Sequence, residues 1–218
     1  MRVPDAHRHG LPLKGTVALV SRSLGRGDPL PVGAWSLGLH PWHLGQEPLE
    51  PRLELLGKAI RYRKGSGIVA IGECGLDRAC EVPWELQVQA FEAQLGLASK
   101  HCLPVVLHVV KAFPEILQAH GSATTPWFVH GFRGGPELAL DLWRHGIRLS
   151  FGPALLGSER LQAAFRALPT EAILLESDEE TFDMPAFYAQ AAAFRGLEPP
   201  VLAEQVRVNL KACGIVLR

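Results

Sequence analysis

The sequence predicts an α/β fold, a (β/α)8 barrel of the TIM type in which the first one or two helices are reduced to loops. Three observations support this prediction: short apolar runs alternate with amphipathic stretches of helix length, there are eight such runs, and several are dense in Val, Ile and Leu without clean alternation. This order is typical of βα units around a parallel sheet whose strands are buried on both faces. The 218 residues suit one such domain, so we expect residues 1–218 to form a single barrel domain.

The apolar runs are the expected strands. They span residues 2–6, 16–21, 34–38, 67–71, 103–107, 127–129, 147–151 and 172–175. Six helices are expected where apolar side chains recur at three- and four-residue spacing. They span residues 50–63, 84–101, 136–145, 158–168, 184–195 and 200–213. Gly146, Gly196 and Gly214 directly follow three of these segments and are expected stop signals.

The first third of the chain departs from the regular barrel pattern. Parallel neighbouring strands normally need a crossover of about a dozen residues, usually helical. Only residues 7–15 separate the first two expected strands, and the next connection, residues 24–33, is rich in Gly and Pro. Either the barrel is open on this side, or the second strand is misplaced. Because Val17 and Leu19 are apolar, we expect this side to form a surface for weak self-association unless the short loops shield the strands.

Composition limits the classes of protein to which the chain can belong. Apolar residues make up 47% and charged residues 20%, which favours a folded core over a disordered chain. The 22 Lys and Arg residues balance the 22 Asp and Glu residues. A protein that grips long nucleic acid usually has a basic surface, so zero net charge weakens that class but leaves room for a local basic patch. No apolar run approaches the roughly 20 residues that span a bilayer, so no membrane partner is expected.

The cysteines and the N-terminus predict a cytoplasmic protein. Cys74, Cys80, Cys102 and Cys213 form no CxxC pair, and their spacing suggests neither a zinc knuckle nor a disulfide framework. The first ten residues contain no apolar segment of the kind found in secretory signals. Reduced thiols in the cytoplasm are the simplest interpretation.

Histidines and carboxylates stand at the ends of the expected strands. In a barrel, the carboxyl ends of all strands meet at one rim, where active sites are built. His7 and His9 are two residues apart, so both imidazoles can point to the same face of an extended chain. A single histidine of this kind is more often structural than a ligand, but a complete set in this order is hard to explain as packing. The expected ligands of a metal site at this rim are His7, His9, Glu73, His108, His130 and Asp178.

The motifs that carry these residues resemble a known family, the TatD-like metal-dependent deoxyribonucleases of the amidohydrolase superfamily. The resemblance covers essentially the whole chain and includes residues 87–98 and the Asn-Leu-Lys sequence at 209–211. The matching motifs are DAHRH (5–9), GLHPWH (38–43), IGECGLD (71–77), LPVVLH (103–108), VHGFRGG (129–135) and ILLESD (173–178).

The resemblance implies a barrel with one or two divalent ions that hydrolyses DNA phosphodiesters, and we expect two ions, Mg, Mn or Zn. By carry-over, His7, His9 and Asp178 hold one ion. His108 and His130 hold the other, and Glu73 bridges the two. Glu73 and Asp178 are then the expected catalytic residues, with Asp178 accepting the proton of the attacking water.

The sequence also differs from the family in ways that concern the substrate. The family usually has Arg two residues after the histidine of the fourth motif, whereas this chain has Val110 followed by Lys111. The segment after Asp178 lacks the usual Pro-containing loop, and the first third is short. These differences affect substrate binding more than metal binding.

Four residues are expected to contact the substrate. His40 and His43 follow the third expected strand, and His40 either orients a substrate oxygen or supports the site from behind. Lys111 and Arg133 are expected phosphate contacts, the latter beside glycines that let backbone amides approach an anion. The expected substrate is DNA. The alternatives are a small phosphoester, a lactone or an amide, or a barrel that keeps its metal but acts as a binding protein.

Overall fold

Eight parallel strands form one sheet in the computed structural model, which describes residues 2–24, 33–121 and 123–217. Neighbouring strands follow one another in chain order from β1 to β8. The strands are β1 (Val3–Arg8), β2 (Thr16–Ser23), β3 (Trp35–Gly38), β4 (Ile68–Asp77), β5 (Val105–Val110), β6 (Trp127–Val129), β7 (Arg148–Phe151) and β8 (Ile173–Leu175). All eight expected strands are confirmed, and β1, β2, β4 and β5 run beyond the ends that the sequence indicated.

The barrel closes between the first strand and the segment that follows the last. The backbone N–H of Asp178 donates to the carbonyl of His7 at 3.0 Å, and the N–H of His9 donates to the carbonyl of Asp178 at 3.0 Å. These bonds form a parallel bridge just beyond β8. The structure is therefore a nearly closed (β/α)8 barrel, as the sequence predicted, and the chain segments that close it carry three of the expected metal ligands.

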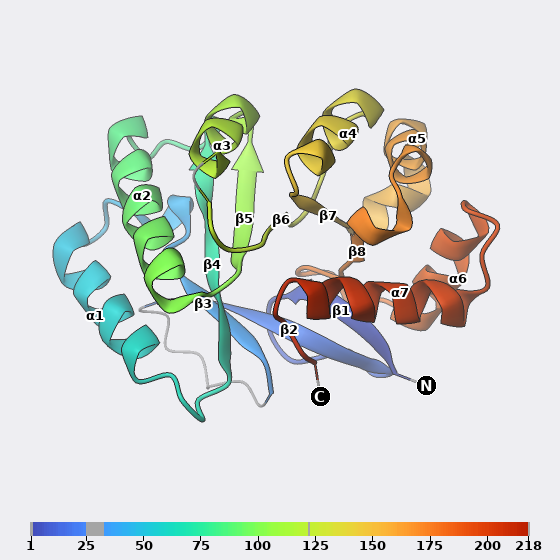
Figure 1. Ribbon diagram of the computed structural model, residues 1–218, viewed down its shortest axis with the longest axis horizontal. Helices are drawn as coiled ribbons and strands as arrows, with labels where there is room; N and C mark the ends of the chain where they lie inside the picture. Colours follow the sequence, from blue (N-terminus) through green and yellow to red (C-terminus); the bar gives the residue numbers. More distant parts are fainter. Residues whose placement is uncertain (1, 25–32, 122, 218) are drawn as a thin grey trace.

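Seven α-helices of the described residues pack around the sheet (Figure 1). They are α1 (Leu49–Arg61), α2 (Trp84–His101), α3 (Phe113–His120), α4 (Pro136–Arg144), α5 (Glu159–Ala167), α6 (Met184–Ala193) and α7 (Pro199–Ala212). Short 3-10 helices are η1 (Pro41–His43), η2 (Pro153–Gly157) and η3 (Thr170–Ala172). The six expected helices are confirmed to within two residues at each end. The sequence reading missed α3, because its eight residues give too short a periodic pattern.

The first βα unit lacks a helix, as expected. Residues 9–15 between β1 and β2 form bends and a turn, in which Thr16 donates from its backbone N–H and from its hydroxyl to the Leu13 carbonyl. Strand β2 is where the sequence placed it, so the alternative of a misplaced strand is wrong. The Gly- and Pro-rich connection at 24–33 lies almost wholly outside the described residues.

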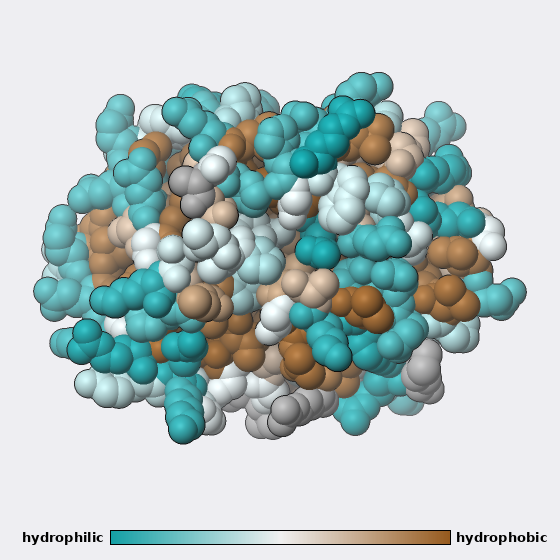
Figure 2. Space-filling view, in the orientation of Figure 1, coloured by the Kyte–Doolittle hydropathy of each residue, from teal (hydrophilic) through white to brown (hydrophobic). Residues whose placement is uncertain are grey.

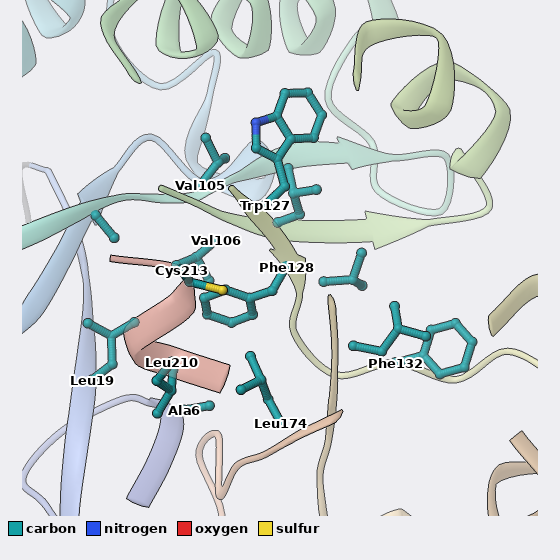
Figure 3. Close-up of a cluster of buried hydrophobic side chains, with 14 of the residues drawn as sticks. Ala6, Leu19, Val105, Val106, Trp127, Phe128, Phe132, Leu174, Leu210 and Cys213 are labelled. Atoms are coloured by element: carbon teal, nitrogen blue, oxygen red, sulfur yellow. The ribbon is translucent and has the colours of Figure 1, made fainter. Parts of the chain in front are cut away.

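Helices from the end of the chain cover the strand that lacks a helix of its own. Both α6 and α7 contact β1, and α7 also contacts β8 (Figure 1). The hydroxyl of Tyr188 in α6 donates to the Pro4 carbonyl at 2.7 Å. Figure 3 shows Leu19 and Ala6 near Leu210 and Cys213, at the end of α7. The C-terminal helices thus supply part of the cover that the short first connection cannot.

The expected self-association surface rested on the apolar side chains of Val17 and Leu19, and one of these is not exposed. Leu19 is fully buried and Val17 is half-buried within the single chain. On the face seen in Figure 2, hydrophilic residues cover most of the helices, and groups of apolar residues lie between them. Self-association through β2 therefore remains a prediction without a contribution from Leu19. Among the described residues, none of the helices combines the length and the apolar character needed to cross a membrane.

Candidate metal centre

The fold brings the six expected ligands to the carboxyl end of the barrel. Glu73 and His108 lie inside β4 and β5, which continue to Asp77 and Val110 rather than ending where the sequence indicated. The two strands approach closely at Gly75, which has φ +149°, and a Cβ atom there would lie 2.0 Å from the His108 carbonyl oxygen. Only glycine fits this position, so the sequence GECG in β4 sets the spacing between the strands that carry Glu73 and His108.

Glu73 lies at the middle of the cluster, and its two carboxylate oxygens face different partners. Oε1 lies 3.1 Å from Nε2 of His7 and 2.7 Å from Nε2 of His9. Oε2 lies 2.9 Å from Nε2 of His130 and 3.9 Å from Nδ1 of His108. The carboxylate therefore divides the cluster into a His7/His9 half and a His108/His130 half.

Asp178 completes the first half. Its Oδ1 lies 3.6 Å from Nε2 of His7 and 3.7 Å from Nε2 of His9. The side chains of His9 and Asp178 are 36% and 40% exposed, whereas those of His108 and His130 are 11% and 9% exposed. The first half of the cluster is therefore the one open to solvent and to a substrate.

Several atoms of the cluster are buried without a hydrogen-bond partner among the described residues. They are both ring nitrogens of His7, Oε1 of Glu73 and Nδ1 of His130. Leaving such a polar atom unsatisfied costs about 1–3 kcal/mol, so native structures rarely do so without a reason. The unpaired atoms and their neighbours are the imidazole and carboxylate donors that bind divalent ions. The residues present therefore fit a metal centre.

Two carboxylates that the sequence reading left out orient the buried histidines. Oδ2 of Asp77 lies 3.1 Å from Nε2 of His108, which leaves Nδ1 of that ring facing the cluster. Oε1 of Glu176 lies 3.7 Å from Nδ1 of His130, an ion-pair contact too long for a hydrogen bond, on the side of the ring opposite the Nε2 that faces Glu73. Carboxylates in this position fix the ring orientation of metal-binding histidines. Both residues lie in motifs that the sequence analysis had singled out. Asp77 is the last residue of IGECGLD, and Glu176 is the first acidic residue of ILLESD.

A second missed group holds the loop that carries Asp178. The buried Arg8 guanidinium donates to the Ser177 hydroxyl at 3.0 Å and to the Glu180 carbonyl at 2.9 Å. Asp5 accepts from the Ser177 hydroxyl at 2.6 Å and from its backbone N–H at 3.0 Å. Burial raises the pKa of Asp5 to about 7, although its bonds to Ser177 act in the opposite direction. Asp178 itself has φ +55°, a conformation that this network and the backbone bridge to β1 maintain.

The electrostatics of the cluster follow from close burial of opposite charges. Burial alone would raise the pKa of Glu73, but the neighbouring His130 and His7 hold it well below its usual value. Burial likewise opposes protonation of His130, yet Glu73 and Glu176 on either side raise its pKa well above the usual value. His108 behaves differently, because burial, together with His40 and His130, lowers its pKa to about 4. A neutral His108 is the form that binds a metal ion.

The expected substrate contacts fall into two groups. His40 and His43 lie beside the cluster and line a hollow of about 480 Å³ open to solvent, which His9, Ser23 and Glu73 also border. Arg22, at the end of β2, also borders this hollow and was missed because its strand was expected to stop at residue 21. Lys111 and Arg133 are exposed, and within the described ranges neither forms a hydrogen bond or an ion pair with the cluster.

A nearly closed barrel of parallel strands with imidazoles and carboxylates gathered at their carboxyl ends defines a metal-dependent hydrolase. The comparison with known families agrees, because residues 30–213 match the family described as TatD related DNase. The chain belongs to this family.

Several known proteins are similar to most of this chain. The chain is 30% identical to a 3'-5' ssDNA/RNA exonuclease TatD of Erwinia billingiae, over 96% of this chain and 89% of that protein. It is 30% identical to the uncharacterized metal-dependent hydrolase YjjV of Escherichia coli, over 71% of this chain and 61% of that protein. The crystal structure of Escherichia coli YjjV, a TatD homolog, superposes with a TM-score of 0.79 at 23% identity, covering 91% of this chain and 86% of the other. The structural match independently supports the barrel fold.

Proposed function

We propose that the chain is a divalent-metal-dependent phosphodiesterase that hydrolyses single-stranded nucleic acid. The observation that carries the proposal is the division of the cluster by Glu73, whose two oxygens each face a separate set of nitrogen donors. Such a carboxylate suits a bridge between two ions. In this proposal His7, His9 and Asp178 would hold one ion, His108 and His130 would hold the other, and Glu73 would contribute to both. The mixed donors suit Zn or Mn as well as Mg.

The metal and the protein have separate parts in the reaction. When bound, divalent ions would lower the pKa of the attacking water towards neutrality and would polarise the phosphoryl oxygen. Asp178 accepts the proton of the attacking water, a role that suits the exposed side of the cluster where its side chain lies. Glu73 is buried, and its imidazole neighbours hold it as a carboxylate. Its two oxygens face the histidines of both halves of the cluster and so fix their relative positions.

His40 is proposed to orient a substrate oxygen. Its Nδ1 accepts the backbone N–H of Trp42 at 3.1 Å, so the proton of the neutral ring belongs on Nε2. That Nε2 lies 3.5 Å from Oε2 of Glu73, at the edge of the hollow. A nitrogen that carries a proton cannot bind a metal ion but donates a hydrogen bond. His40 is therefore better suited to a phosphoryl oxygen than to an ion, although it lies within reach of Glu73 and His108.

The nucleic-acid substrate is supported by the relatives and by the rim of the barrel. The similar protein of Erwinia billingiae is named for exonuclease action on ssDNA and RNA. Lys111 and Arg133 follow β5 and β6 at the same rim as the cluster and are exposed. His43 accompanies His40 in the hollow, where its Nδ1 lies 3.2 Å from the Ser23 hydroxyl. We assign these basic residues to phosphates of the bound strand.

We also propose that residues 1–218 act as one hydrolase domain in the cytoplasm. The four cysteines, Cys74, Cys80, Cys102 and Cys213, are all free. Burial raises the pKa of Cys74 and of Cys213, so neither thiol is ionised at neutral pH. Free thiols of this kind suit a reducing compartment.

The proposal is tested by metal content and substrate range together. Protein stripped with a chelator and reconstituted with Mg, Mn or Zn should bind up to two ions per chain by elemental analysis. It should then hydrolyse a single-stranded oligonucleotide and bis-p-nitrophenyl phosphate, and the chelator should abolish both activities. Hydrolysis of a lactone or an amide without either phosphodiester would overturn the substrate class. Bound metal without turnover of any substrate would identify a binding protein, and the absence of bound ions would contradict the metal centre itself.

A further inference from the structure

An exposed indole stands beside the metal centre. Trp42 lies in η1, two residues after His40, and is 54% exposed. Among the described residues the other exposed large aromatic side chain is Tyr62, which caps the far end of α1. A large aromatic side chain is costly to leave in water. Trp42 stays exposed where its ring contacts those of His40 and His108, beside the cluster.

The indole is held in place along one edge. Its Nε1–H donates to Oδ2 of Asp77 at 2.6 Å, and Asp77 also bonds His108. The rings of His40 and His108 stand nearly perpendicular to the indole, with ring centroids 5.0 and 5.3 Å away. Trp42 is therefore tied to the cluster side while more than half of its surface stays open to solvent. A ring fixed in this way loses little conformational entropy when a second ring stacks on it.

The chain also needs a source of affinity for a nucleic-acid strand other than charge. Its net charge is zero, so no overall positive charge attracts the strand, and the proposed phosphate contacts are confined to the rim. Proteins that bind single strands without sequence preference combine cations along the backbone with aromatic platforms for the bases. Lys111 and Arg133 lie at the same rim, and Trp42 is the aromatic side chain exposed there.

We propose that Trp42 is the stacking platform for a nucleobase of the bound strand, an inference that rests on the proposed function and names the part of the substrate recognised. A base on Trp42 lies beside His40, the residue assigned to a phosphoryl oxygen, so stacking positions the neighbouring phosphodiester at the cluster. Small phosphoesters, lactones and amides have no base and gain nothing from this contact. Trp42 thus selects nucleic acid over those substrates.

The test compares the binding of intact oligonucleotides with that of oligonucleotides that lack one base. Short single-stranded oligonucleotides carry one abasic residue at each position in turn, and binding to metal-loaded protein is measured by fluorescence anisotropy alongside KM for cleavage. At one position, loss of the base should weaken binding to the wild type about 5- to 150-fold, the range for one base–aromatic stack. Trp42→Ala should weaken binding of the intact strand by a similar factor and no longer respond to that abasic position.

Two further variants separate stacking from support of Asp77. Trp42→Phe keeps an aromatic face but lacks the N–H donor, so it should retain most of the response to the abasic position. Tyr62→Ala removes an aromatic ring that is even more exposed than Trp42, 74% against 54%, at the C-terminal end of α1, and should bind and cleave like the wild type. If Trp42→Ala responds to the abasic scan as the wild type does, the inference is wrong even where the oligonucleotide is cleaved. Failure of the wild type to cleave any phosphodiester overturns the proposed function instead, and the binding data still decide the role of Trp42.

Discussion

The two halves of the metal cluster are built by different means. His7, His9 and Asp178 are held through the backbone, by hydrogen bonds that join β1 to the segment after β8. His108 is held through its side chain by a hydrogen bond with Asp77, and the carboxylate of Glu176 lies 3.7 Å from Nδ1 of His130, at ion-pair distance. In the first half, the side chains of His9 and Asp178 are more than one-third exposed. In the second half, both histidines are nearly buried.

The two halves differ in exposure because different elements pack against them on the two sides of the barrel. Strands β4 to β8 belong to regular βα units, so their residues are covered and can be oriented by buried carboxylates. Strand β1 has no helix directly after it and depends on the closure with Asp178, on Arg8 and on α6 and α7. A catalytic group that must receive a proton from water belongs on the open half. Ligands that only hold an ion can be buried on the other.

The largest effect is expected from Asp178 on the open half. Asp178→Asn keeps the size of the side chain but removes the proposed base and weakens one proposed metal ligand, so kcat should fall by about 10²–10⁴ or more. Steady-state kinetics on bis-p-nitrophenyl phosphate with saturating metal, together with circular dichroism, check the result. The matched control is Glu180→Gln, an exposed acid two residues away, which should cleave at the wild-type rate. Near wild-type turnover in Asp178→Asn would show that another group is the base.

A smaller effect, confined to one ion, is expected from the carboxylates of the buried half. Asp77→Asn and Glu176→Gln remove the carboxylates beside His108 and His130, so affinity for one of the two proposed ions should fall about 10- to 100-fold. Calorimetric titration of chelator-treated protein with Mn should show one weakened site and one unchanged site. Equal weakening of both sites would mean that the two halves are not independent. Glu159→Gln, on the exposed first turn of α5, serves as the control.

These supporting residues also show what the sequence could not predict. The convergence of the six expected ligands was predictable because each follows an apolar run and because the carboxyl ends of barrel strands converge. The orientation of His108 and His130 by Asp77 and Glu176 was not, because it depends on which ring nitrogen faces which neighbour in space. The short helix α3 was missed because eight residues form too few turns to show a period. Which of the six ligands bind an ion remains a prediction.

On the open half, Arg8 is expected to matter for stability more than for chemistry. Its buried guanidinium bonds Ser177 and the Glu180 carbonyl, and Lys cannot reproduce this fork. Arg8→Lys should lower the free energy of unfolding by about 1.5–3 kcal/mol, the range for a lost hydrogen bond to a charged group. Urea denaturation measures the change, with Arg61→Lys on the exposed end of α1 as the control. An unchanged midpoint would mean that the loop carrying Asp178 does not depend on Arg8.

The smallest effect is expected on stability, from α6, which packs against β1 where no helix follows that strand directly. The buried Tyr188 of α6 donates its hydroxyl hydrogen to the Pro4 carbonyl. Tyr188→Phe keeps the ring and its packing but leaves that carbonyl without this donor, so the free energy of unfolding should fall by about 1 kcal/mol, up to ~3 if the carbonyl finds no other partner. Tyr62→Phe, at an exposed ring, should change it by less than about 0.5 kcal/mol. If the two variants unfold at the same urea concentration, α6 covers β1 by apolar packing alone. A lower midpoint for Tyr188→Phe with unchanged metal affinity would show instead that the hydrogen bond anchors the strand without setting the positions of His7 and His9.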